Sequence, residues 1–257
     1  MREFLDDANQ HRNDGYGRAQ AHVKPQLPKR FYEAATVKPM EAGFAVALDG
    51  KVPKTPGLKP VVMPSEAIAA AVAAEWAAQR EFIDPQTMPM TRLVNSAVEA
   101  GAEAMPALRD EIVKYAGNDL LFYRADAPAT LVKRQDEIWD DALVKLARQF
   151  GVSFQPTIGI LHQPQPAPTL GRLNEALAGE ALFPLTAMNA VTSITGSGLL
   201  ALALRHRLLD AEQVWRAAHV DEDHNIGLWG EVEEITTRRA KRRAEFDAAV
   251  RMLDLSA

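Results

Sequence analysis

The chain has 257 residues, of which 47% are hydrophobic and 25% charged, and these values exclude a disordered tail protein, a collagen and a coiled-coil rod. Its net charge of −5 argues against a general binder of polyanions. The chain contains no cysteine, which excludes disulfides, cysteine-ligated zinc, iron–sulfur clusters and thiol catalysis.

The first residues predict a loosely held arm and no targeting signal. Asp6 and Asp7 interrupt the opening segment before the apolar run of a secretory signal can form, and acids this early also argue against a mitochondrial transit peptide. Residues 13–30 combine glycine and proline with few large apolar side chains. We therefore expect a flexible N-terminal arm over residues 1–29 of a cytoplasmic protein.

Residues 30–64 are expected to form a small β-rich domain. Gly43–Leu48 alternates large and small residues, and Asp49-Gly50 lies between two apolar runs. Such a dipeptide favours a tight hairpin turn, because glycine accepts the positive φ of that turn. We expect residues 30–63 to be mostly strand and, since so small a β unit is marginal alone, to pack against other elements.

The period of the apolar residues changes from two to about 3.6 at Ser65, which predicts a larger all-helical domain over residues 65–257. Ser65 is suited to be the N-cap of the first helix. A long amphipathic helix is expected from Leu131 to Phe150, with Gly151 at its end. The predicted fold class is therefore α+β, with the β-rich unit first and the helical domain second.

The uncharged stretch Leu185–Leu204 is long enough to cross a membrane. It also contains threonine, serine and asparagine side chains, which are costly inside lipid. We therefore expect no membrane span but a buried helix, or two short ones broken at Gly196–Gly198. A last pair of helices is expected over residues 211–220 and 228–253.

The segment His219–His224 groups two imidazoles and three carboxylates, which are metal-ligating side chains. It supports one alternative function, a metal-dependent enzyme. Ligands must converge on the ion, however, and consecutive acidic residues on a helix or turn point in different directions. We favour an exposed acidic turn and expect no metal site. Gly196–Gly198 matches neither a phosphate loop nor a nucleophile elbow. Because the sequence shows no nucleophile–base or metal motif, we also expect no catalytic residue, no cofactor and no small-molecule substrate.

A basic run, Arg238–Arg243, places five cations in six residues near the C-terminus. Such a run supports a second alternative, a nucleic-acid-binding module. Acidic residues precede it, however, and Glu234 lies four residues before Arg238, a spacing that favours an ion pair along one helix. We therefore favour a charged helix face near a partner and expect no nucleic acid as that partner.

Trp229 is followed by Glu231, Glu233 and Glu234, at the point where the last helix is expected to begin. One interpretation is a helix start in which acids complement the helix dipole. The other is a protein interface, because tryptophan is enriched at interface hot spots and charged groups select the partner. The residues alone leave both interpretations open.

Several segments, taken in chain order, resemble one known family. They are Lys29–Tyr32, Leu48–Lys51, Lys54–Pro56, Glu75-Trp76 with Gln79, Met88–Leu93, Asp119–Ala125, Gln135–Trp139 and Trp229–Glu231. Together they resemble the assembly chaperones of F-type ATP synthase that serve the alpha subunit of the catalytic head. The resemblance covers nearly all of residues 29–253, and its specificity lies in the ordered set and not in any single motif.

The resemblance implies a chaperone and not an enzyme. A member of this family binds the unassembled alpha subunit as its partner and prevents its aggregation until the beta subunit replaces the chaperone. The resemblance also implies an important acidic residue in the C-terminal part, which we expect among Glu231, Glu233 and Glu234, with Trp229 beside it in the partner-binding site. A bacterial member would be cytoplasmic, and a eukaryotic relative would be in the mitochondrial matrix.

Overall fold

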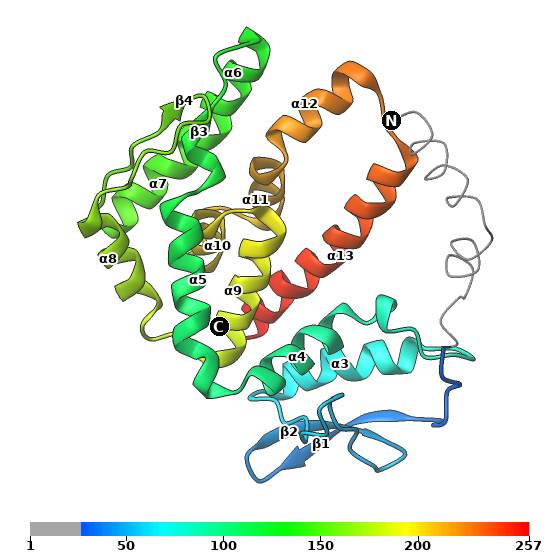
Figure 1. Ribbon diagram of the computed structural model, residues 1–257. Coiled ribbons are helices and arrows are strands. Elements are labelled where there is room, and N and C mark those ends of the chain that lie inside the picture. The colour runs from blue at the N-terminus through cyan, green and yellow to red at the C-terminus, as the bar shows by residue number, and fades with distance from the viewer. Residues whose placement is uncertain (1–26, 257) are drawn as a thin grey trace, which may run out of the picture. The chain divides into compact units, whose positions relative to one another are not determined.

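The computed structural model describes residues 27–256 (Figure 1). The chain divides into two compact units. The smaller unit joins Gln79–Asp84 to the described residues 27–31, for example by a hydrogen bond from Ile83 N to Pro28 O at 2.8 Å. The larger unit contains Tyr32–Ala78 and the chain after Asp84. Of the arm expected over residues 1–29, residues 1–26 lie outside the described part of the chain. The expected division of the rest into domains at residue 64 stays a prediction.

The β-rich part of the larger unit is an antiparallel hairpin of β1 (Ala35–Met40) and β2 (Gly43–Leu48). Met40 pairs with Gly43, so the turn between the strands falls at residues 41–42. Asp49-Gly50 forms a second tight turn, in which Leu48 and Lys51 exchange backbone hydrogen bonds at 2.8 and 3.0 Å. The dipeptide therefore marks a turn, as predicted, but not the one that joins the two strands.

The expectation that residues 30–63 are mostly strand is wrong. From Lys51 to Met63 the backbone forms only isolated bridges and no further strand. Pro53, Pro56 and Pro60 explain the difference, because proline lacks the N–H group that a strand ladder requires.

The hairpin packs on helix α3 (Glu66–Ala78), which begins where the sequence predicts. The Ser65 Oγ accepts a hydrogen bond from Ile68 N at 3.3 Å and so caps the helix. Tyr32 donates its hydroxyl proton to Trp76 O at 2.7 Å, and the two rings meet edge to face with centroids 5.6 Å apart. These contacts give the small β unit the packing partner that it needs.

The regular structure after α3 is helical apart from one short pair of parallel strands, and this confirms the α+β fold class. Its helices are α4 (Pro89–Ala100), α5 (Met105–Gly117), α6 (Ala129–Gln135), α7 (Asp141–Phe150), α8 (Ala167–Leu177), α9 (Leu182–Thr195), α10 (Gly198–Arg205), α11 (Ala211–Ala218), α12 (Val220–Trp229) and α13 (Glu233–Leu255). The strands are β3 (Tyr123–Arg124) and β4 (Thr157–Ile158).

The Glu75 carboxylate connects α3 to α4. It accepts hydrogen bonds from Met90 N at 2.8 Å and from Thr91 N at 2.7 Å, both in the first turn of α4. A carboxylate at this position satisfies helix N–H groups that have no partner within the helix and complements the helix dipole.

The amphipathic helix expected from Leu131 to Phe150 is present but interrupted. α6 continues into a π-helical turn at Asp136–Asp140, and α7 follows. Gly151 ends α7 in the left-handed conformation with φ of 63°, which confirms the predicted end.

The chain after residue 210 forms three helices in place of the two that the sequence predicts. α12 ends at Trp229, Gly230 follows with φ of 83°, and α13 begins at Glu233. Glycine adopts a positive φ readily, so the helix breaks at this point. Trp229 therefore ends one helix instead of beginning the next, which corrects the prediction.

The uncharged stretch forms the centre of the helical part. α9 and α10 are separated at Gly196–Ser197, as predicted, and the Ser197 Oγ caps α10 by accepting from Leu200 N at 2.9 Å. α9 packs against α5, α10 and α13 (Figure 1). Among residues 27–256, none of the helices combines the length and apolarity that a membrane crossing requires.

Asp119 is a fully buried carboxylate that joins the turn before β3 to the start of α10. Its Oδ2 accepts hydrogen bonds from Ser197 Oγ at 2.8 Å and from Leu199 N at 3.0 Å, and its Oδ1 accepts from Leu121 N at 3.2 Å. Burial raises the pKa of Asp119 to about 7, although these donors act in the opposite direction.

Asp119 predicts a pH-dependent contribution to stability. Between about pH 4 and about pH 7 the folded state holds a proton that the unfolded chain releases, so this contribution to the free energy of unfolding falls as the pH rises. Asp119→Asn should lose this dependence. Urea unfolding of both proteins near the two ends of the range measures it, and an equal change in parent and variant would contradict the prediction.

Gly198 predicts a second effect on stability, because α10 approaches α5 closely at this residue. An added Cβ would lie 2.2 Å from Ile112 O and 2.8 Å from Ala116 N, which are backbone atoms. We expect Gly198→Ala to lower the free energy of unfolding by about 1–3 kcal/mol. The control is Gly171→Ala in α8. There the described residues place no atom within 4 Å of the added Cβ, apart from the adjoining residues and the backbone of the helix itself, and alanine favours the helix. Equal unfolding midpoints for the two variants would refute the close approach.

Candidate partner-binding surface

An exposed apolar cluster flanked by acids lies where α12 meets α13, and we name residues 228–234 the α12–α13 corner. Trp229 is 82% exposed, Leu228 60% and Val232 55%. All four predicted site residues lie in the corner: Trp229, Glu231, Glu233 and Glu234. The sequence does not single out Leu228 and Val232, because apolar residues beside a helix end are typical of core packing.

The three corner acids are exposed, and within residues 27–256 they have no ion-pair partner. Glu233 and Glu234 lie in the first turn of α13, where they complement the helix dipole. The dipole interpretation and the interface interpretation are therefore compatible, since an exposed carboxylate can complement the helix and still face a partner.

The acids of His219–His224 have structural partners, so the expectation of an exposed acidic turn is wrong. Asp221 accepts a hydrogen bond from Gln135 Nε2 at 2.7 Å. Asp223 forms an ion pair with Arg239 of α13 at 2.5 Å, and Glu222 approaches the same guanidinium at 3.8 Å. These contacts tie α12 to α6 and α13.

The imidazole of His219 is part of the protein core. Its Nδ1 lies 2.7 Å from Trp215 O, and its ring packs on the Trp215 ring with centroids 4.0 Å apart. Burial lowers the pKa of His219 and so favours the neutral ring. In the described part of the chain, no three histidine or acidic side chains are grouped as a metal would require.

The basic run Arg238–Arg243 is divided between two roles. Three of its cations are used inside the protein: Arg239 pairs with α12, Arg242 donates to Ile194 O, and Arg243 pairs with Glu212 and Asp247. Arg238 and Lys241 are exposed, and neither has an ion-pair partner among residues 27–256. Because two of the five cations are paired with acids and Arg242 is turned to a backbone carbonyl, only Arg238 and Lys241 of the run are exposed to a polyanion.

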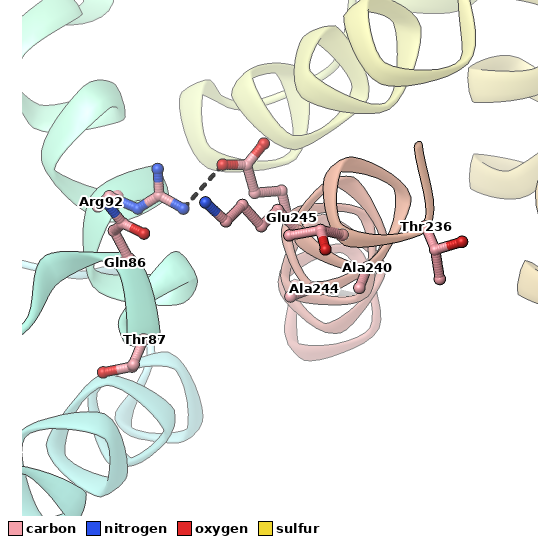
Figure 2. Close-up of a pocket in the computed structure, with 9 residues that line it drawn as sticks. Gln86, Thr87, Arg92, Thr236, Ala240, Ala244 and Glu245 are labelled. Atoms are coloured by element: carbon pink, nitrogen blue, oxygen red, sulfur yellow. Dashed lines mark hydrogen bonds and ion pairs between the residues drawn. The ribbon is translucent and has the colours of Figure 1, made fainter. Parts of the chain in front are cut away.

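A groove with a volume of about 790 Å³ runs beside α13 (Figure 2). Gln86, Thr87 and Arg92 line one side, and small or charged residues of α13 line the other. Figure 2 shows an ion pair between Arg92 and Glu245, at 2.8 Å, that joins the two sides. Both of these side chains remain partly exposed.

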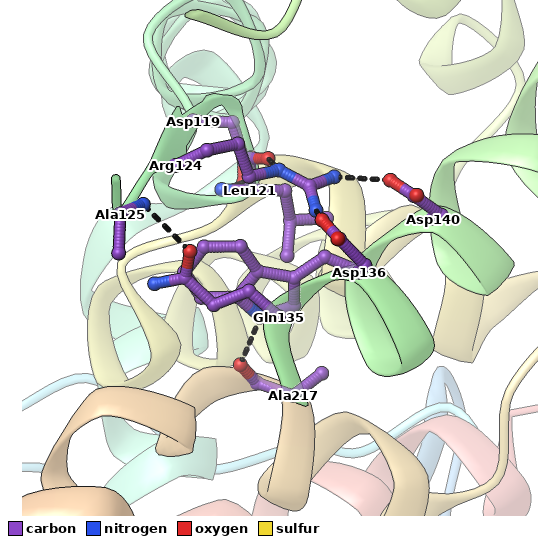
Figure 3. Close-up of polar contacts among 9 residues, drawn as sticks. Asp119, Leu121, Arg124, Ala125, Gln135, Asp136, Asp140 and Ala217 are labelled. Carbon is purple, nitrogen blue, oxygen red and sulfur yellow. Dashed lines mark hydrogen bonds and ion pairs between the residues drawn. The ribbon is translucent and has the colours of Figure 1, made fainter. Parts of the chain in front are cut away.

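A polar network holds the π-helical turn and α12 in place (Figure 3). Gln135 accepts a hydrogen bond from Ala125 N at 2.8 Å while its amide nitrogen binds Asp221. Trp139, which is buried, donates its indole N–H to Ala217 O at 2.8 Å. Figure 3 shows Arg124 directed towards Asp136 and Asp140, with ion-pair distances of 3.5 and 2.7 Å.

This network gives physical roles to two of the segments on which the family resemblance rests, Asp119–Ala125 and Gln135–Trp139. Arg124 also lies over the Trp139 ring, 5.3 Å from its centroid. The π-helical turn presents Asp136, Trp139 and Asp140 together to these partners. The two segments therefore position α12, and with it the corner.

Comparison with known proteins identifies relatives over most of the chain. A sequence model of the ATP12 chaperone protein family matches residues 29–147. A putative chaperone from Agrobacterium tumefaciens has a similar structure, with 39% sequence identity, a TM-score of 0.87, and coverage of 95% of this chain and 92% of that chain. For Atp12 from Paracoccus denitrificans the identity is 36%, the TM-score 0.83, and the coverage 90% and 99%.

A more distant relative comes from a eukaryote. The mitochondrial protein atp12 of Schizosaccharomyces pombe is 22% identical over 218 residues, which cover 80% of this chain and 75% of that protein. The chain belongs to the ATP12 chaperone family, which confirms its resemblance to the ATP synthase assembly chaperones and makes it a chaperone and not an enzyme.

The ion pair between Asp223 and Arg239 predicts a measurable coupling energy. Each side chain is only 23% exposed, so we expect a coupling of about 1–2 kcal/mol in a double-mutant cycle of Asp223→Ala and Arg239→Ala. The matched control is the exposed pair Lys133–Glu137, with exposures of 77% and 63%, for which about 0.3–0.5 kcal/mol is expected. Urea unfolding measures both cycles, and equal couplings would count against a structural role for Arg239.

Proposed function

We propose that the protein binds the unassembled alpha subunit of F-type ATP synthase and prevents its aggregation until the beta subunit replaces it. Membership of the ATP12 chaperone family supports a role in ATP synthase assembly. The ordered sequence segments supply the resemblance to chaperones of the alpha subunit. An alpha subunit without beta exposes a large apolar interface, and such surfaces associate indiscriminately. A protein that covers this interface suppresses aggregation by mass action and requires no ATP.

The α12–α13 corner is the surface that we propose for this binding. The observation that carries the proposal is the 82% exposure of Trp229, beside the exposed Leu228 and Val232. A cluster of this kind loses apolar surface to water when a client covers it, and tryptophan is the residue type most enriched at interface hot spots. The carboxylates of Glu231, Glu233 and Glu234 would face arginine or lysine side chains of the client.

The place of action follows from the partner. A bacterial protein of this kind would act in the cytoplasm, where the subunits are made, and a eukaryotic relative would act in the mitochondrial matrix. The bacterial sources of the similar structures and the mitochondrial name of the Schizosaccharomyces pombe relative support this proposal.

Charge reversal in the corner should weaken client binding without unfolding the chaperone. Glu231→Lys, Glu233→Lys and Glu234→Lys change exposed charges, which usually alters stability by less than about 0.5 kcal/mol. If the client buries the pair, reversal should cost about 2–5 kcal/mol of binding free energy. Lysine should be more harmful than glutamine, because it adds repulsion to the loss of attraction. The measurement is suppression of alpha-subunit aggregation by each variant.

Two further variants make this test specific. Trp229→Ala should also reduce protection of the alpha subunit, because it removes the largest exposed apolar side chain of the corner. Glu66→Lys, an exposed acid in the first turn of α3, is the matched control and should protect the client as well as the parent does. If every corner variant protects like the parent, the corner is not the client-binding surface.

A further inference from the structure

The groove beside α13 extends beyond the hollow that Figure 2 shows, which we call its central part. The hollow at the start of α13 shares Thr237 and Lys241 with the central one, and its volume is about 480 Å³. A hollow between α4 and α9 shares Arg92 and Glu245 with the central one, and its volume is about 250 Å³. The three hollows therefore form one continuous depression, which we name the α13 groove. It begins at Glu233 and Glu234, so it is continuous with the α12–α13 corner.

The α13 side of the groove allows a polypeptide to approach closely. Thr237, Ala240 and Ala244 have small, exposed side chains and recur along this face of the helix. Leu93 and Ile194 add apolar surface at the far end. A bound segment therefore meets small side chains in the centre of the groove and apolar side chains at its end.

The charges along the groove have a definite order. Acids come first, at Glu233 and Glu234, and the cations Arg238 and Lys241 follow, which have no ion-pair partner in the described part of the chain. Glu234 and Lys241 are about 10 Å apart along the helix axis, from a rise of about 1.5 Å per residue. The next charges, Arg92 and Glu245, neutralise each other. The groove thus carries a negative end, a positive centre and no net charge beyond it.

We propose that the α13 groove binds an acidic segment of the alpha subunit, with one of its carboxylates on Lys241 and Arg238. The segment continues the contact made at the corner, where a cation of the client faces Glu231, Glu233 or Glu234. The client therefore presents a basic group and, about 10 Å further along α13, an acidic one. The order of these charges fixes the direction in which the segment lies. This inference rests on the proposed function for the identity of the client.

Protein and not nucleic acid is the occupant that the charges favour. A phosphate backbone repeats its negative charge along its whole length, whereas the groove alternates acids and cations. Alternating charges select a partner of complementary order and reject uniform polyanions.

The first test reverses the charge of the groove centre. The double variant Arg238→Glu and Lys241→Glu should bind purified alpha subunit on the order of tenfold more weakly than the parent does. Arg251→Glu is the matched control, because Arg251 is an exposed cation of the same helix outside the groove. Thermal unfolding of each variant verifies that the fold is intact.

The outcomes of this test distinguish failure of the groove proposal from failure of the proposed function. Weak binding by the double variant, together with normal binding by Arg251→Glu, supports the proposal that the α13 groove binds the client. Equal binding by parent, double variant and control overturns the groove and leaves the proposed function standing. Failure of the parent to bind or protect the alpha subunit overturns both. If the double variant does not fold, the photo-crosslinking measurement that follows decides the matter.

The second test places a photo-crosslinking amino acid at Ala240 in the groove or at Ala74, an exposed residue of α3 that serves as control. In the complex with alpha subunit, the probe at Ala240 should capture a client peptide that contains aspartate or glutamate. Capture no greater than at Ala74, or capture of a peptide without an acidic residue, would overturn the proposal.

Discussion

The position of α12 depends on buried and half-buried polar contacts with distant parts of the chain, and the candidate surface depends on α12. Arg239 holds Asp223 at 2.5 Å, and Gln135 holds Asp221 at 2.7 Å. Because the acids of α12 point to α13 and α6, the helix is fixed in place, and its last residue, Trp229, lies at the surface. Because these contacts fix α12 before a partner arrives, the backbone of the corner is preorganised for binding.

Charges of one short segment have separate tasks in this protein. Arg239, Arg242 and Arg243 hold α13 to its neighbours, while Arg238 and Lys241 remain exposed. The acids follow the same division, because those of α12 have partners and those of the corner have no ion-pair partner among residues 27–256. Paired charges stabilise the fold, and unpaired ones are available to a client. The net negative charge and the basic run therefore do not identify the partner until the ion pairs inside the protein are known.

Local rules predicted the parts of the fold that depend on neighbouring residues. Ser65 caps a helix, Gly151 ends one, and Gly196–Ser197 separates two, as their residue types indicate. The π-helical turn and the use of Asp221 were not predictable, because the partner of Asp221, Gln135, lies 86 residues away. The break at Gly230 was missed because the acids that follow it are compatible with a helix that has already begun at Trp229. The role of the four predicted site residues in client binding stays a prediction. The groove was not predictable, because it needs α4 beside α13, a contact that no periodicity reveals.

Hydrogen–deuterium exchange of the chaperone, free and in complex with purified alpha subunit, tests the central claim most directly. If the corner and the groove are the client-binding surface, peptides from residues 228–245 should exchange more slowly in the complex. Peptides from the hairpin, residues 35–48, should exchange equally in both states. Protection of the hairpin with no change over residues 228–245 would contradict the account and place client binding on the β unit.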